Sequence, residues 1–178
     1  MGYFYGVFIR DLDVTSLIRA LPVMPVEREN MHITITYIGD DRPSQGVDDR
    51  VGVSIGSMPC FRAKLGQLIL LPSVLRPKVL AVEIINNKQL SKLRSIIVSI
   101  LRDSGISMND KYSGEFKPHI TIAYIKSKKV NPQNILETTR EMGIEKELLN
   151  KSLLIENVSL ILARGNNYRE ISRHKLQC

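Results

Sequence analysis

The chain lacks a hydrophobic run long enough to cross a membrane, and its start lacks the marks of a signal peptide. A transmembrane helix needs about 20 consecutive apolar residues, whereas the apolar stretches here are broken by polar side chains. The apolar start, Met1 to Ile9, has neither a basic region nor a small-residue cleavage site, so we expect a strand there rather than a signal. These absences favour a cytoplasmic protein that has no membrane partner.

Cysteine and histidine are both scarce. Two cysteines, Cys60 and Cys178, are too few for a disulfide framework. Zinc sites usually take three or four His, Cys or carboxylate ligands, and the chain has only three histidines and no close cysteine pair. We therefore expect no metal and no cofactor. The third histidine, His174, is expected to face solvent. The chain also has no glycine-rich P-loop and no ligase lysine motif, so an ATP-dependent reaction has no support.

Composition suits one globular, basic domain. The 178 residues are 43% hydrophobic and carry a formal net charge of +7. Such a length fits one large domain or two small lobes with a shared core. A positive balance favours polyanions such as nucleic acid, because lysine and arginine neutralise phosphates. A lysine-rich solvated surface explains the same charge, so charge alone leaves both readings open.

Periodicity and turn residues predict a mixture of strands and helices. The clearest helix lies between Asn87 and Ser104, with one apolar face and Gly105 just beyond its end. The other expected elements are strands over 3–9, 31–38, 60–71, 78–85 and 119–125, a closing hairpin of 151–163 and 168–176, and helices over 13–20, 44–55 and 132–142. Because these elements do not alternate strictly as βαβ units, the pattern predicts an α+β fold.

Two of the predicted strands are nearly identical. One begins His32-Ile33-Thr34-Ile35-Thr36-Tyr37-Ile38, and the other reads His119-Ile120-Thr121-Ile122-Ala123-Tyr124-Ile125. Residues i and i+2 of a strand share a face. Each strand therefore presents an imidazole beside a hydroxyl and an apolar opposite face, on which we expect the two tyrosines to pack. The repeat suggests two similar lobes that face each other across a cleft.

A pair of imidazoles is suited to metal-free phosphodiester chemistry. With an ordinary pKa of about 6.5, one ring can donate a proton while the other accepts one. The threonine hydroxyls can donate hydrogen bonds to phosphate oxygens. One His-x-Thr strand is common and mostly structural, so the inference rests on the duplication.

At these residues the chain resembles the two-histidine (2H) phosphoesterases, within them the RNA 2′,3′-cyclic phosphodiesterase group, also called 2′-5′ RNA ligases. The matching stretches are 29–39, which reads Glu-Asn-Met-His-Ile-Thr-Ile-Thr-Tyr-Ile-Gly, and 116–122, which reads Phe-Lys-Pro-His-Ile-Thr-Ile. The resemblance implies one bilobal domain over residues 1–178, with two pseudo-symmetric antiparallel-sheet lobes, outer helices and a central cleft. It implies hydrolysis of RNA 2′,3′-cyclic phosphate ends to 2′-phosphates without a metal.

The same resemblance implies residue roles and a substrate. His32 would be the general acid and His119 the general base, although the residues themselves do not order the two roles. Thr34 and Thr121 would bind the phosphate of an RNA or nucleotide substrate. We expect a monomer.

One position departs from the family. Many members carry arginine where this chain has Tyr124. Lys126 and Arg164 are candidates to supply the missing cation. Two alternatives therefore stay open: a phosphodiesterase or ligase that acts on other 2′-5′-linked or cyclic nucleotides, and a module that binds RNA or nucleotides with little catalysis.

Overall fold

The computed structural model describes residues 1–85, 88–108, 116–125 and 131–178. The strands are β1 (Gly2–Phe8), β2 (Met24–Pro25), β3 (His32–Gly39), β4 (Phe61–Leu71), β5 (Val79–Ile85), β6 (His119–Tyr124), β7 (Ser152–Ile155), β8 (Asn157–Arg164) and β9 (Asn167–Lys175). The helices are α1 (Thr15–Ile18), α2 (Gln45–Ile55), α3 (Lys88–Asp103), α4 (Pro132–Glu141) and α5 (Ile144–Leu149), and a 3-10 turn covers Arg28–Asn30.

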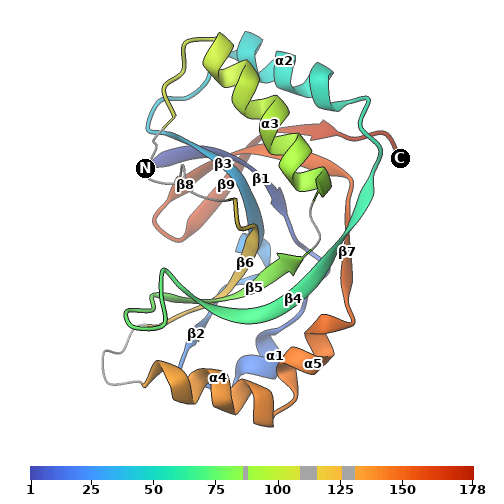
Figure 1. Cartoon of the computed structure of the whole chain (residues 1–178). Coiled ribbons are helices and arrows are strands. Elements are labelled where there is room, and N and C mark those ends of the chain that lie inside the picture. Colours follow the sequence, from blue (N-terminus) through green and yellow to red (C-terminus); the bar gives the residue numbers. More distant parts are fainter. Residues whose placement is uncertain (86–87, 109–115, 126–130) are drawn as a thin grey trace.

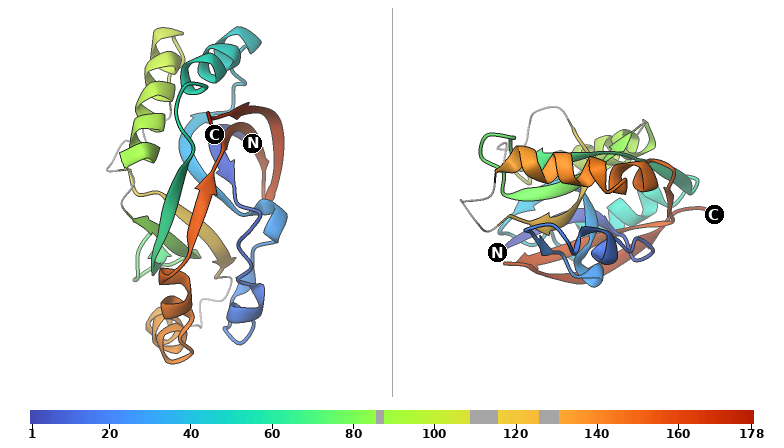
Figure 2. Two further views of the ribbon diagram at one scale, coloured as in Figure 1. Left: turned by 90° about the vertical axis from the view of Figure 1, so that its right-hand side faces the viewer. Right: turned by 90° about the horizontal axis from the view of Figure 1, so that it is seen from below.

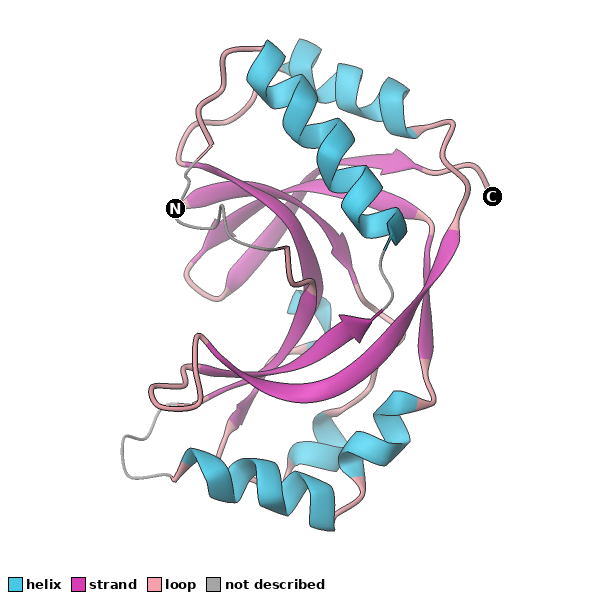
Figure 3. Ribbon diagram, viewed as in Figure 1, coloured by secondary structure: helices cyan, strands magenta, loops and turns pink. Residues whose placement is uncertain are grey.

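The strands form one curved, nine-stranded sheet made of two halves (Figure 3). Its order is β7-β4-β5-β6-β3-β1-β8-β9, with β2 beside β6, and the pairs are antiparallel. The two near-identical strands, β3 and β6, are the central pair. They meet through one residue pair, Ile33 with Ile120. One lobe contains β3, β1, β8 and β9, and the other contains β6, β5, β4 and β7 with the short β2 beside β6. The innermost strand of each lobe carries one His-x-Thr motif.

The helices lie on the outer sides of the two lobes (Figures 1 and 2). In these views α2 and α3 pack together over the lobe of β1, β3, β8 and β9, and α4 and α5 lie over the other lobe. The chain visits the lobes alternately, because α3 follows β5 in sequence and β8 follows β7. The predicted α+β class, antiparallel lobes and outer helices are confirmed.

Local sequence signals account for most element ends. The side chain of Ser44 accepts a hydrogen bond from the backbone of Val47 and caps α2. Asn131 caps α4 in the same way, with Pro132 in its first turn. Gly105 follows α3 with a φ of 73°, a left-handed conformation that glycine adopts without strain. These helices were predicted within a few residues of their observed ends.

The predicted closing hairpin was wrong in its first strand. The stretch 151–163 forms two strands, which separate at Glu156. β7 pairs with β4 in one lobe, whereas β8 pairs with β1 and β9 in the other. The whole stretch is rich in β-formers, and only the tertiary pairing reveals the break.

His174 does not face solvent as predicted. Its Nε2 atom donates to a carboxylate oxygen of Asp48, 2.8 Å away, and the hydroxyl of Tyr5 donates to the same oxygen at 2.8 Å. The His174 side chain is only 12% exposed. A Cβ at Gly52 would lie 2.4 Å from its Nδ1 atom, so glycine is needed there for the ring to enter between α2 and the sheet. This cluster fastens β9 to α2.

The two cysteines are paired, although they form no framework. Cys60 and Cys178 form a disulfide, with their Cα atoms 5.0 Å apart. Backbone hydrogen bonds from Cys60 to Gln177 and from Gln177 to Met58 hold the same segments together. Because disulfides are uncommon in the cytosol, this pair gives no support to the cytoplasmic location expected from the sequence.

Within the described ranges, no helix is both long enough and apolar enough to cross a membrane.

Candidate active site

The joint between the two lobes places both His-x-Thr motifs side by side. Ile33 and Ile120 are paired and fully buried. Counted from this antiparallel pair, His32 is opposite Thr121 and Thr34 is opposite His119. Residues opposite each other share a face, with Cβ atoms about 5 Å apart in a regular pair. The four predicted site residues are half-buried, whereas Ile33 and Ile120 between them are fully buried, so the four side chains lie on the less covered face of the central strand pair.

Both imidazoles are held in the same way. The Nδ1 atom of His32 lies 2.7 Å from the carbonyl oxygen of Asn30, and that of His119 lies 2.9 Å from the carbonyl oxygen of Lys117. A carbonyl oxygen only accepts, so each Nδ1 carries the hydrogen. Each ring therefore keeps its Nε2 atom to exchange a proton with a substrate.

The surroundings of His32 are aromatic. Its ring centroid lies 4.4 Å from that of Tyr168, 5.0 Å from that of Phe4 and 6.4 Å from that of Phe8. Burial among these rings lowers the pKa of His32, and the nearby His119 lowers it further, against the opposing effect of the Asn30 carbonyl. The two imidazoles are therefore near enough to interact electrostatically.

Tyr124 lies on the same side as the histidines, contrary to the predicted packing on the opposite face. Thr121 pairs with Ala81 and Ala123 pairs with Leu80, so Ile122 is an extra residue in a bulge of β6. The extra residue shifts the alternation of side chains by one, so Tyr124 projects from the same face of β6 as His119 and Thr121. The hydroxyl of Tyr124 is hydrogen-bonded to that of Tyr168, and burial together with this bond raises the pKa of Tyr168.

The first motif strand has a bulge at the equivalent residue. Thr34 pairs with Gly6 and Thr36 pairs with Tyr5, which leaves Ile35 as the extra residue of β3. Tyr37 then pairs with Phe4, whose ring contacts His32. Both tyrosines were thus misplaced for one reason. A bulge has no dependable signal in a single sequence.

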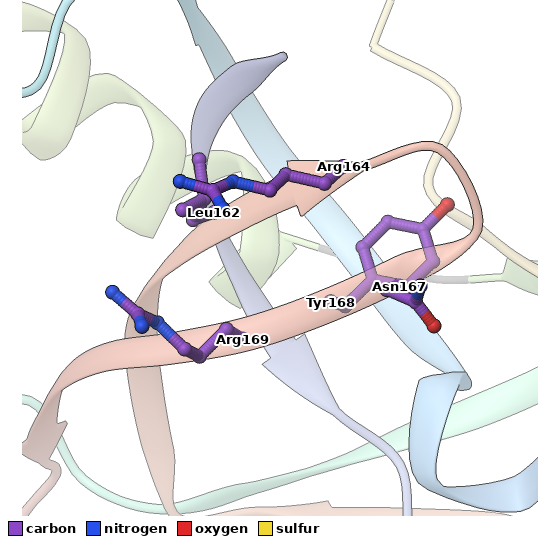
Figure 4. A pocket seen from close by; sticks show the side chains of 5 residues that line it. All are labelled: Leu162, Arg164, Asn167, Tyr168 and Arg169. Carbon is purple, nitrogen blue, oxygen red and sulfur yellow. The ribbon is translucent and has the colours of Figure 1, made fainter.

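Arg164 does not supply the cation that the family resemblance led us to seek. It pairs with Asn167, whereas Tyr168 pairs with Ala163, so Arg164 and Tyr168 project from opposite faces of the β8–β9 hairpin. Figure 4 shows their side chains pointing in different directions. Lys126 lies outside the described residues. Tyr168 itself, which links the two lobes at the site, was not predicted as a site residue, because its motif-free strand carries no sequence signal.

In the part of the chain that the structure describes, no three His, Cys, Asp or Glu side chains gather into a group that could hold a metal ion. The arrangement brings together on the central strands two imidazoles whose Nε2 atoms are available, two threonine hydroxyls and two linked phenols. Such groups can bind and transfer protons around one phosphate.

Comparisons with known proteins agree on one family. Residues 10–167 match the model of the 2′-5′ RNA ligase superfamily. The chain is 30% identical over 155 residues to an RNA 2′,3′-cyclic phosphodiesterase from Aeropyrum pernix, with 85% of each chain covered. It is also 30% identical over 137 residues to an enzyme of the same name from Aquifex aeolicus, with 74% of this chain and 71% of the other covered.

Solved structures share the fold. A protein from Thermus thermophilus superposes with a TM-score of 0.74 at 18% identity, and covers 99% of this chain and 98% of its own. Escherichia coli LigT in its apo form superposes with a TM-score of 0.66 at 18% identity, with the same coverage. LigT has also been solved in complex with 3′-AMP, and that structure has a TM-score of 0.65 at 19% identity, over 98% of this chain and 97% of LigT.

Proposed function

Because this chain belongs to the 2′-5′ RNA ligase superfamily, we propose that it is an RNA 2′,3′-cyclic phosphodiesterase. The observation that carries the proposal is the joint at Ile33 and Ile120, which brings His32, Thr34, His119 and Thr121 together. The two curated relatives bear the name of this activity at 30% identity. The substrate is an RNA or nucleotide with a 2′,3′-cyclic phosphate.

In the proposed reaction a water molecule attacks the phosphorus and the bond to the 3′ oxygen breaks. His119 takes a proton from the water through Nε2, and His32 gives a proton to the departing 3′ oxygen. Thr34 and Thr121 donate hydrogen bonds to the non-bridging phosphate oxygens, where charge builds up. The products are a 2′-phosphate and a free 3′ hydroxyl, and no metal is needed to balance the reaction.

The pKa of His32 bears on this order of roles. Burial among aromatic rings favours its neutral form in the free enzyme. A bound phosphate anion beside the ring stabilises the imidazolium instead, so the substrate itself promotes the protonated form that an acid requires.

The order of roles is tested by the His119→Ala variant, in which His32 is the remaining imidazole of the pair. Its residual kcat/KM is expected to fall as the pH rises through a value below 6.5, because a general acid is inactive once deprotonated. The measurement is a pH–rate profile from about pH 4 to about pH 9, which covers roughly two units on each side of the ordinary histidine pKa of about 6.5. A residual rate that rises with pH over this range would instead make His32 the base.

The activity itself is tested by hydrolysis assays in EDTA. We expect the wild type to open an RNA 2′,3′-cyclic phosphate end faster than it cleaves a 2′-5′-linked dinucleotide or a 3′,5′-cyclic nucleotide. Faster cleavage of either comparison substrate would reassign the substrate within the family. Tight binding of a 2′-phosphorylated nucleotide with no turnover of any substrate would favour the non-catalytic alternative, for which Tyr124 in place of arginine is the main support.

The single-domain organisation, the monomeric state and the cytoplasmic location expected from the sequence stay predictions beside this proposal.

A further inference from the structure

The tip of the β8–β9 hairpin forms a second feature next to the site. A hollow of about 200 Å³ there is lined by Leu162, Arg164, Asn167, Tyr168 and Arg169 (Figure 4). Both arginines are exposed. Among the described residues, neither arginine side chain forms an ion pair or a hydrogen bond. Two arginine side chains thus line one hollow without an ion-pair partner among the described residues.

The strand register separates these arginines from the catalytic groups. Leu162 pairs with Arg169 and Arg164 pairs with Asn167, so these four side chains share one face of the hairpin. Tyr168 projects from the other face, where its ring meets His32 at 4.4 Å. The arginines therefore cannot touch the phosphate that lies between the two imidazoles. Any anion that the two arginines bind therefore belongs to another part of the substrate, on the opposite face of the hairpin from the imidazoles.

We infer that this hollow, the hairpin pocket, binds a backbone phosphate of the RNA strand upstream of its cyclic end. This rests on the proposed function, because a 2′,3′-cyclic phosphate ends its strand and leaves only the 5′ direction for the rest of the RNA. The strand leaves the site past Tyr168 and crosses the hairpin tip. Guanidinium groups match phosphate with paired hydrogen bonds, and Leu162 supplies an apolar floor.

The hairpin pocket therefore favours the binding of oligonucleotides over mononucleotides. A cyclic mononucleotide reaches the imidazoles and threonines but has no phosphate for Arg164 and Arg169. An oligonucleotide with the same end gains those contacts. Binding through phosphates does not depend on base identity and weakens as salt rises.

The test compares a 2′,3′-cyclic mononucleotide with a tetranucleotide that carries the same cyclic end. In the double variant Arg164→Gln/Arg169→Gln, kcat/KM for the tetranucleotide is expected to fall about tenfold or more, mainly through KM. The value for the mononucleotide is expected to stay unchanged. The matched control, Lys92→Gln/Arg102→Gln, removes the same charge from exposed positions of α3 and should leave both values unchanged. Equal losses on both substrates, or an equal loss in the control, would overturn the inference.

A binding measurement tests this inference independently of the proposed function. A labelled tetranucleotide with a 2′-phosphate end is not hydrolysed by this reaction, so its Kd can be measured by fluorescence anisotropy without turnover. The arginine variant is expected to bind it about tenfold more weakly, with a slope of log K against log salt that is smaller by about 0.7 for each lost phosphate contact. Absent hydrolysis with this binding difference would refute only the proposed reaction. Unchanged binding refutes the pocket, whatever the reaction.

Discussion

Replacing either histidine of the site, as His32→Ala or His119→Ala, is expected to lower kcat/KM for a 2′,3′-cyclic phosphate end by a factor of about 10²–10⁴. Each ring handles one of the two protons that move in the reaction, and each is held so that its Nε2 atom is available. The effect should fall mainly on kcat, because alanine leaves both threonine hydroxyls in place to bind the phosphate. Steady-state kinetics at neutral pH measure both constants.

The double variant sharpens this prediction. Groups that act as one unit are strongly non-additive, so His32→Ala/His119→Ala should lose little more activity than the worse single variant. His174→Gln is the control, because this third histidine lies by α2, away from the site, and glutamine keeps a donor for Asp48. Full activity in either single alanine variant would rule out the two-histidine mechanism.

The second large effect concerns stability: Asp48→Ala is expected to lower the free energy of unfolding by about 3 kcal/mol. The carboxylate is buried and accepts hydrogen bonds from Tyr5 and His174, both at 2.8 Å. Alanine leaves that hydroxyl and that imidazole without their acceptor in a closed space. Urea unfolding with an unchanged m-value measures the loss. A loss below about 1 kcal/mol would show that the cluster does not fasten β9 to α2.

The pH dependence of this contribution follows from the pKa of Asp48. Burial acts to raise that pKa, but hydrogen bonds from His174, Ser172 and Tyr5 outweigh it, so the pKa is lowered. A carboxyl whose folded pKa is lowered stabilises the protein above its unfolded pKa of about 3.9 and stops doing so as the pH falls through the folded value. The difference in stability between wild type and Asp48→Asn should therefore shrink below about pH 4. A difference that grows on acidification would contradict this account.

Periodicity and turn residues predicted most of the framework. The motif strands and α3 have strong periodic patterns, and Gly105 marks the end of α3 by local chemistry. The split of 151–163 between two lobes was missed because either half of the stretch can form a strand. Pairing partners, which lie far away in sequence, decide where such a stretch breaks.

The sequence predicted the histidines and threonines of the candidate site but not the surrounding tyrosines, Tyr124 and Tyr168. The duplication of His-x-Thr singled out the four residues that the joint at Ile33 and Ile120 brings together. Tyr124 was placed on the wrong face because the bulge at Ile122 shifts the period by one. Tyr168 of β9 reaches His32 of β3 across β1 and β8 of the same lobe, and the sequence of a single strand does not show such a long-range contact.

The position of the phosphate in the product tests the central claim most directly. Wild-type protein is incubated in EDTA with an oligonucleotide that ends in a 2′,3′-cyclic phosphate, and ³¹P NMR identifies the new end group. Two imidazoles acting on one phosphate, with the 3′ oxygen as the leaving group, predict a 2′-phosphate as the only product. A 3′-phosphate, or an intact cyclic end after prolonged incubation, would contradict the account.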